Sequence, residues 1–361
     1  MLRFLTAGES HGQAELAILE GIPVGLSVTE EIIQKDLDKR RGGAGRGGRG
    51  LIEKDKVKIL SGVRLGKTIG SPIALLVENS DFQNWKVTMS VHPPSEQTSH
   101  LREVSNPRPG HADLAGALKY GFSDIRNVIE RSSARETIMR VAIGSICRRF
   151  LSEFNIQIDS RIIRIGKMEI PDNSQIEEII IRALKKKDTL GGVIQIIARN
   201  VPPGLGSYVH WDRKLDGLIA RALMSIPSVK AVEIGDGITN AGKFGSQVHD
   251  EIYYDEKYLR KTNHAGGLEG GVTNGEDIVC RVYHKPLSTL GNPFNTINLQ
   301  TKKSVKAVVE RSDICVVPRA GVISEAMIAF VLSDVLLEKF GSDNLNDIKK
   351  NYQNYLRRIK I

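Results

Sequence analysis

The sequence predicts an α+β protein that folds as a single domain. Helical and strand signals alternate along the 361 residues without a fixed repeat period, which excludes solenoid folds. No Pro/Ser-rich linker divides the chain, and its 40% of hydrophobic residues can form one substantial core. We therefore expect one domain over residues 1–361, with a charged and polar C-terminal end that frays.

The first third of the chain predicts one helix and two strands. The helix is expected over residues 29–41, because Thr29 can cap it and apolar side chains recur on one face. Strands are expected at 57–63, where apolar residues alternate, and at 72–79, where they are continuous. Residues 82–110 carry few periodic signals and predict a long functional loop.

The remainder predicts further helices and strands around a second glycine-rich loop. A helix is expected over 132–154, where Ser133 and Glu136 have capping-box spacing before an apolar stripe. The other expected elements are strands at 193–199, 229–234 and 278–285, helices at 212–226 and 324–340, and a loop at 263–275.

Composition narrows the class of protein. The net charge of +9 suits nucleic acid, membrane surfaces or small polyanions, but aromatic residues make up only 5%, too few for stacking on single strands. The three cysteines, far apart in the sequence, form no CxxC pair and indicate reduced thiols. The N-terminus has no signal-peptide h-region, and no apolar run approaches the roughly 18 residues of a membrane span. We expect a cytoplasmic protein that binds neither membrane nor nucleic acid.

The segment KRRGGAGRGGRG at residues 39–50 admits two interpretations. It matches the RGG arms that hold RNA, and it also matches a mobile basic lid over a phosphorylated substrate. Because it is internal, free of aromatic residues and flanked by helix and strand signals, the lid is favoured. Two further glycine motifs lack the context of a nucleotide site: GAGRGG at 43–48 follows a helix, and GVRLGKT at 62–68 precedes a strand.

Three short segments bring ionisable groups to turns and helix ends. GESHG (8–12) holds Ser10 and His11 on an exposed, adaptable backbone, where the imidazole can act as a general acid. NPRPGHADL (106–114) places Arg108 and His111 around a Pro-Gly turn before a helix, where they could bind a phosphate. ERSSARET (130–137) places two arginines and two hydroxyls at a helix N-terminus, which is the composition of an anion site. Each also fits an ordinary turn or helix cap. The sequence contains no HExxH and no nucleophile elbow, and we expect no metal.

These segments, in this order, resemble the chorismate synthase family. The resemblance runs over about residues 3–340 through long motifs that include DLDKRRGGAGRGGR, PRPGHADLAGALKYG, ERSSARETIMRVA, NHAGGLEGGVTNG and ERSDICVVP. It implies a single-domain β-α-β sandwich, usually a homotetramer, in which residues 341–361 are an extension. It further implies conversion of 5-enolpyruvylshikimate 3-phosphate to chorismate and phosphate by anti-1,4-elimination with reduced FMN.

The resemblance also implies roles for individual residues. His11 is expected to act as the acid at the leaving phosphate, His111 to stabilise the reduced flavin, and Asp334 to lie near flavin N5. Arg40 and Arg46 match positions assigned to NADPH, and Ser10, Arg49, Arg108 and Arg135 are expected to bind substrate. Flavin contacts are implied for Arg131, Ser132, Ser133, Ser228, Gly270, Lys285, Pro286, Leu287, Ser288, Thr289 and Arg311.

Alternatives stay open at this point. Pro227–Ser228 stands where members often have an amide residue and alanine, and proline lacks a backbone N–H. An FMN-binding redox enzyme with another phosphorylated substrate, or an RGG-type RNA-binding protein, are the competing functions. No reductase domain is visible, which favours an external flavin reductase over self-reduction with NADPH.

Overall fold

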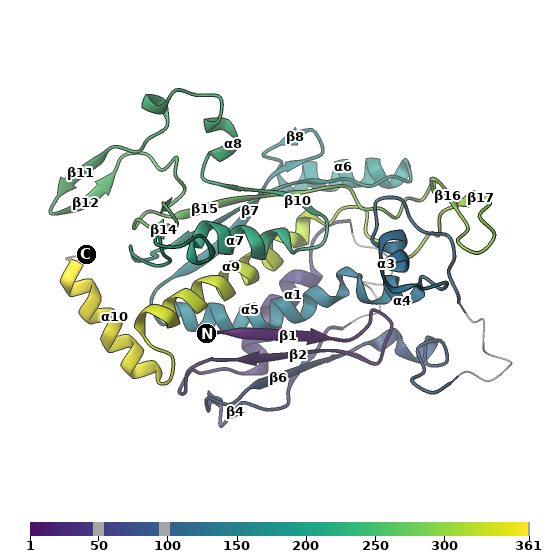
Figure 1. Cartoon of the computed structure of the whole chain (residues 1–361), viewed down its shortest axis with the longest axis horizontal. Coiled ribbons are helices and arrows are strands. Elements are labelled where there is room, and N and C mark those ends of the chain that lie inside the picture. Colours follow the sequence, from purple (N-terminus) through teal and green to yellow (C-terminus); the bar gives the residue numbers. More distant parts are fainter. Residues whose placement is uncertain (46–53, 94–101, 360–361) are drawn as a thin grey trace.

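Two antiparallel sheets enclose a layer of helices in the computed structural model (Figure 1), which describes residues 1–45, 54–93 and 102–359. This arrangement is the α+β sandwich that the sequence analysis expected. The smaller sheet has the strand order β1-β2-β6-β3 and the larger one β10-β15-β9-β7-β8. The strands are β1 Arg3–Ala7, β2 Ala14–Glu20, β3 Val57–Ile59 and β6 Ile73–Glu78, and β7 Gln157–Ile165, β8 Met168–Glu169, β9 Gly192–Arg199, β10 Val229–Ile234 and β15 Ile278–His284.

The helix layer is built on α5 (Thr137–Ser152) and α9 (Val317–Phe340), which pack along each other between the sheets (Figure 1). Close approach is possible because Gly144 has no side chain: a Cβ there would lie 2.2 Å from the Cβ of Ala326. Shorter helices, α1 (Glu30–Arg41) and α7 (Leu215–Met224), pack against α9. One continuous apolar core therefore runs through both sheets and the layer between them.

The helix predicted at 29–41 is confirmed, since Thr29 Oγ1 accepts from Ile32 N at 3.4 Å. The helix predicted at 132–154 begins later than expected: a 3-10 turn at Ala134–Glu136 leads into α5, and α4 (Arg126–Arg131) ends just before the predicted start. The predicted capping box is wrong: Ser133 accepts from Arg135 N, but Glu136 binds Arg140 and Thr6 instead of turning back. The strand expected at 57–63 ends at Ile59, and Val63 starts a separate short hairpin.

Helix α9 begins seven residues before the predicted position, with Pro318 in its first turn, where the missing N–H costs nothing. It is also long and apolar enough to cross a membrane, with a mean hydropathy of 1.9 over 18 residues. The expectation that no apolar run reaches that length is therefore corrected. Since 83% of that window is buried inside the protein, α9 has the character of a core helix.

The C-terminal extension is a helix and not a frayed end. Helix α10 (Leu345–Ile359) buries Leu345 and Ile348, and the rings of Tyr352 and Tyr355 pack edge-on against Phe340 at 5.3 and 5.4 Å. Its strongly one-sided apolar face explains why a segment rich in charge still folds onto α9.

A small satellite core supports the end of the molecule where α3 (Asp113–Tyr120) and α4 lie (Figure 1). Val104, Ala117, Ile125 and Ile129 form it, with Leu299 and Val308 packed against them. The remaining elements are peripheral: β4 Val63–Arg64, β5 Lys67–Thr68, α6 Asn173–Lys185, α8 Gly237–Asn240, β11 Ile252–Asp255, β12 Lys257–Arg260, β13 Leu268–Glu269, β14 Val272–Thr273, β16 Asn295–Ile297 and β17 Ser304–Lys306.

Candidate active site

The turn between β1 and β2 carries Ser10 and His11 into the protein interior. His11 is 6% exposed, so the expectation of an exposed backbone at this turn is wrong. Its ring stacks on Trp85 with a centroid distance of 3.8 Å, and its Nδ1 lies 2.9 Å from Glu130 Oε1. Because Glu130 engages Nδ1, Nε2 is the ring nitrogen that can reach a ligand.

Glu130 is a buried carboxylate that holds this turn in place. It accepts from His11 N at 2.7 Å, and Arg126 Nη1 lies 3.5 Å from Oε1. Burial acts to raise its pKa, but the hydrogen bonds and charges of His11 and Arg126 outweigh burial and hold the pKa below its usual value. The Glu130 carboxylate therefore fixes the orientation of the imidazole through Nδ1 and leaves Nε2 as the nitrogen that can exchange a proton with a ligand.

The junction of α4 and α5 faces the same turn. Ser10 Oγ donates to Ser133 Oγ at 3.0 Å, and Arg131 donates to the carbonyls of Thr6 and Gly8, both at 3.0 Å. Ser132 Oγ donates to Val128 O at 2.6 Å. The sequence analysis expected a helix N-terminus here, whereas the segment is the end of α4 followed by a 3-10 turn.

A group of guanidiniums lies behind this junction, at the N-terminal end of α9. Arg135 Nη1 donates to Asp55 Oδ1 at 2.8 Å, and Arg40 Nη1 lies 3.6 Å from Asp55 Oδ2. Burial lowers the pKa of Arg40 to about 10, with Arg135 and Arg319 acting in the same direction and Asp55 opposing them. Guanidiniums this close together leave positive charge for an anion to neutralise.

Arg319 is a site residue that the sequence analysis missed. It donates through Nη1 to Asp313, while its buried Nε and Nη2 have no hydrogen-bond partner among the residues that the structure describes. The basic segment begins beside it, since a Cβ on Gly43 would lie 3.0 Å from Pro318 Cβ. The available signal was the cation that directly follows ERSDICVVP in the sequence.

A second group of candidates gathers around the loop before α3. His111 Nδ1 lies 2.5 Å from Asp113 Oδ1, and Arg108 Nε donates to Asp113 Oδ2 at 2.8 Å. Burial acts to raise the pKa of Asp113, but hydrogen bonds from His111 and Arg108 prevail and keep it well below its usual range. Arg108 Nη1 also donates to Thr289 Oγ1 at 3.0 Å, which joins this loop to the predicted flavin-binding run.

The run from Lys285 to Thr289 wraps around the tip of the same loop. Lys285 Nζ and Ser288 Oγ donate to Gly110 O at 3.0 and 2.7 Å. Gly110 has a φ of +77°, and a Cβ there would lie 3.4 Å from Ser288 Oγ. Thr189 Oγ1 donates to the carbonyl of Leu287 at 2.8 Å, and Pro286 lies between these anchored residues.

Ser228 adjoins this run, although it departs from the residue type that the resemblance leads one to expect. Its carbonyl accepts from Lys285 N at 2.9 Å, and its Oγ lies 2.9 Å from His284 Nδ1. Burial lowers the pKa of His284 to about 4, so this imidazole is neutral near pH 7. Ser228 has a φ of +71°, a conformation that its hydrogen bonds help to hold.

Polar side chains connect the two groups. Arg311 donates to Asp81, which accepts from Trp85 Nε1 at 3.3 Å, and Trp85 stacks on His11. Arg126 Nη2 lies 2.9 Å from Glu310 Oε1. The segment with Glu310 and Arg311 in turn adjoins the second group, since Val308 N donates to Asn106 O at 3.2 Å, two residues before Arg108. The two groups therefore form one polar region toward the end of the molecule where α3 and α4 lie (Figure 1).

Two candidates lie elsewhere. Asp334 Oδ1 accepts from Leu2 N at 2.6 Å, at the opposite end of β1 from the turn with His11, about 16 Å of strand away. Gly270 lies at the N-terminal end of α7, where Leu215 N donates to Gly271 O at 2.9 Å, whereas Ser228 follows the C-terminal end of that helix. The predicted sites Arg46 and Arg49 fall outside the described residues.

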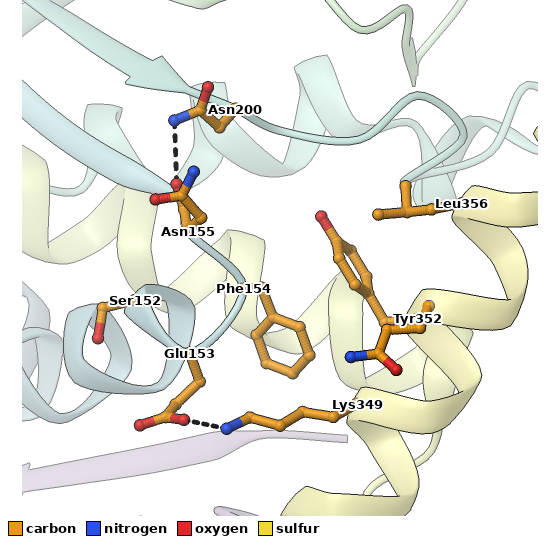
Figure 2. A pocket seen from close by; sticks show the side chains of 9 residues that line it. Ser152, Glu153, Phe154, Asn155, Asn200, Lys349, Tyr352 and Leu356 are labelled. Carbon is orange, nitrogen blue, oxygen red and sulfur yellow. Dashed lines mark hydrogen bonds and ion pairs between the residues drawn. The ribbon is translucent and has the colours of Figure 1, made fainter. Parts of the chain in front are cut away.

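One cavity lies apart from this region. It has a volume of about 510 Å³ and lies between the end of α5 and α10. Lys349 and Glu153, which line it, pair with each other (Figure 2). Since these charges neutralise each other, the cavity offers no charge to an anion. Within residues 1–45, 54–93 and 102–359, no group of three or more His, Cys, Asp or Glu side chains could hold a metal ion.

Comparison with known proteins agrees with the resemblance. The family model described as chorismate synthase matches residues 2–337. Chorismate synthases of Aquifex aeolicus (strain VF5) and Thermoanaerobacter pseudethanolicus are 48% and 50% identical to this chain; the alignments cover 99% of it and 98% and 99% of those proteins. A solved structure, described as the crystal structure of chorismate synthase, has a TM-score of 0.79 and 40% identity over 99% of this chain and 98% of that one.

Proposed function

This chain belongs to the chorismate synthase family and is a carbon–oxygen lyase that forms chorismate in the shikimate pathway, and we propose that it does so at the polar region around His11 and His111. The single observation that carries this placement is the group of guanidiniums beside a histidine whose Nδ1 is held by a carboxylate, with two Arg319 nitrogens that have no partner among the described residues. The substrate, 5-enolpyruvylshikimate 3-phosphate, carries two carboxylates and a phosphate, which require such a concentration of positive charge.

Binding and departure of the phosphate are assigned to the β1–β2 turn and the guanidiniums. Ser10, Arg135 and Arg40 would contact the anionic groups of the substrate, with Arg108 holding the opposite side. His11 Nε2 would donate a proton to the leaving phosphate, while Glu130 stabilises the imidazolium through Nδ1. Predicted substrate contacts by Arg49, and NADPH contacts by Arg40 and Arg46, belong to the same proposal.

The family is flavin-dependent in general, and the residues around Gly110 fit reduced FMN. Around Gly110, Lys285 supplies a cation and Ser228, Ser288 and Thr289 supply hydroxyls, and the missing Cβ of Gly110 lets Ser288 approach its backbone. Arg131, Ser132 and Ser133 at the α4–α5 junction, and Arg311, would supply the remaining contacts. When bound, reduced FMN would supply transient electron density to the departing system. His111, whose Nδ1 donates to Asp113 Oδ1, would stabilise the reduced ring. A flavin contact by Gly270 stays a prediction.

The carboxylate that takes part in removal of the C6 proton is best sought near the guanidiniums. The resemblance implied Asp334, and that role stays a prediction. Asp313, however, accepts from Arg319 and contributes to the electrostatic environment of Arg40. We therefore propose Asp313 for this role, because a residue must lie within reach of the proton that it accepts.

The proposal extends to the cellular setting. A homotetramer in the cytoplasm fits the family and the basic character of the chain. Its reduced flavin would come either from an external reductase or from its own reduction of flavin with NADPH. Anaerobic turnover by the purified protein, with and without NADPH, distinguishes the two sources of reduced flavin.

The decisive experiment on the placement is the His11→Gln variant. Its turnover with 5-enolpyruvylshikimate 3-phosphate and chemically reduced FMN should fall by about 10²-fold or more, with FMN affinity retained. His210→Gln, which changes an exposed histidine, is the matched control and should resemble the wild type. Unchanged turnover in His11→Gln would remove the proposed acid and shift the site away from this turn.

A further inference from the structure

Glu15 is a buried carboxyl on β2, directly behind the turn that carries Ser10 and His11. The residue is 1% exposed, and its Oε2 has no hydrogen-bond partner in the described part of the chain. A Cβ on Gly8 would lie 2.8 Å from Glu15 Oε2, so the carboxyl rests against the backbone of the turn itself. No step of the proposed reaction uses this carboxyl.

The surroundings of Glu15 combine strong burial with charges of both signs. Burial is the largest influence and raises the pKa of Glu15 to about 7, while two arginines act to lower it and two glutamates act to raise it. On the neighbouring strand β6, Val77 is its register partner and is apolar. The charged groups that face it are Arg135 and Glu136 of the 3-10 turn, Arg131 at the end of α4, and Glu9 of the β1–β2 turn.

The turn, the arginines and Glu15 form one connected unit. Arg131 Nη1 donates to Gly8 O at 3.0 Å, on the residue against which the carboxyl lies. Arg135 Nε donates to Asn79 Oδ1 at 2.7 Å, and Asn79 Nδ2 donates to the carbonyl of Gly12 at 2.8 Å. A charge on Glu15 is therefore felt by both arginines and by the turn that is proposed to meet the phosphate.

We propose that Glu15 is a positioning residue that couples one proton to anion binding at the site of Ser10 and Arg135, which Arg131 adjoins. When a dianion binds, a Glu15 carboxylate takes up a proton from solvent and becomes a neutral carboxylic acid; when the anion leaves, the proton is released. An ionised Glu15 neutralises part of the arginine charge and repels the incoming anion across a poorly screened interior. The inference rests on the proposed function only in placing the phosphate at this turn.

Sulfate is the probe for the test, because its charge stays constant across the range in which Glu15 titrates. Calorimetric titration of the full-length wild type should show sulfate affinity falling by about tenfold between about pH 6 and about pH 8.5. The isosteric Glu15→Gln variant should lose most of this dependence, while any contribution of the histidines remains in both proteins. In buffers of different ionisation enthalpy, the wild type should take up a proton on binding sulfate and Glu15→Gln should take up less.

Glu20→Gln is the matched control, since Glu20 ends the same strand with its side chain 45% exposed and paired with Arg3. It should retain the wild-type dependence. An identical pH dependence and proton uptake in wild type and Glu15→Gln would overturn the inference and leave the anion site standing. Failure of the wild type to bind sulfate at any pH would overturn the anion site, and the inference with it.

A measurement on the wild type alone keeps the test independent of how variants fold. Sulfate addition near pH 8 should produce the carbonyl stretch of a protonated carboxylic acid in the infrared difference spectrum. The same band should be absent from Glu15→Gln or, should that variant not fold, from Glu15→Leu. A wild-type spectrum without the band would contradict the proposed proton uptake.

Discussion

The two ends of the helix layer bury very different groups, although the same helices α5 and α9 run through both. At the N-terminal end of α9, Arg40, Arg135 and Arg319 lie together, and within the described residues Asp55 and Asp313 are the acids that pair with them. At the other end, Asp334 accepts from the backbone of Leu2, and aromatic rings of α10 pack on Phe340. Buried charge is costly unless it is paired, so its excess at one end indicates where a ligand completes the pairing.

The sharpest challenge to this comparison is the pair of variants Asp313→Asn and Asp334→Asn. We expect turnover to fall by about 10²-fold or more in Asp313→Asn, because the carboxylate lies among the guanidiniums, and to change by less than about twofold in Asp334→Asn. Single-turnover chorismate formation with pre-reduced FMN is the measurement. If turnover fell equally in Asp334→Asn and Asp313→Asn, the proposed role in removal of the C6 proton could belong to Asp334. The two ends of α9 would then no longer differ in function.

The charged end should also make stability depend on pH through Glu15. Its folded pKa of about 7 lies above the unfolded value of 4.5, so the folded protein holds this proton more tightly. The resulting stability is fully present below pH 4.5 and is lost as pH rises through about 7, by roughly 3 kcal/mol in all. Denaturant titrations from pH 5 to pH 8.5 should show a decline that Glu15→Gln lacks; parallel declines in both proteins would contradict the raised pKa.

The Arg319→Leu variant tests whether the positive charge of Arg319 contributes to substrate binding. The variant removes a guanidinium whose Nε and Nη2 have no partner among the described residues, so it should cost little stability. We expect KM for the phosphorylated substrate to rise by about tenfold or more, with Arg213→Leu, an exposed arginine paired with Glu338, as the control. A variant that loses stability without a change in KM would mean that Arg319 only anchors Asp313.

The fold class and most of the residues that gather at the charged end can be predicted from the sequence, because the motifs that carry them are long and local. Sequence reasoning misjudged features that depend on tertiary contacts. His11 is buried because Trp85 and Glu130, from distant segments, close over the turn. The end of the chain folds because α9 offers Phe340 to Tyr352, a contact that composition does not reveal. Arg319 and Glu15 carry no signal in the sequence and become informative only because, within the part of the chain that the structure describes, some of their buried polar atoms have no partner.

The smallest expected effect concerns the C-terminal end of α9 and the hydrogen bond from Leu2 N to Asp334. Asp334→Ala removes the acceptor at 2.6 Å and should lower the free energy of unfolding by about 1–2 kcal/mol, whereas Asp334→Asn keeps an oxygen there and should recover most of it. Amide exchange at Leu2 should quicken in Asp334→Ala only. Equal losses in both variants would show that the charge of Asp334 matters more than its hydrogen bond. The C-terminal end of α9 would then also contain a carboxylate whose charge stabilises the protein. The two ends of α9 would differ less in the buried charge that they hold.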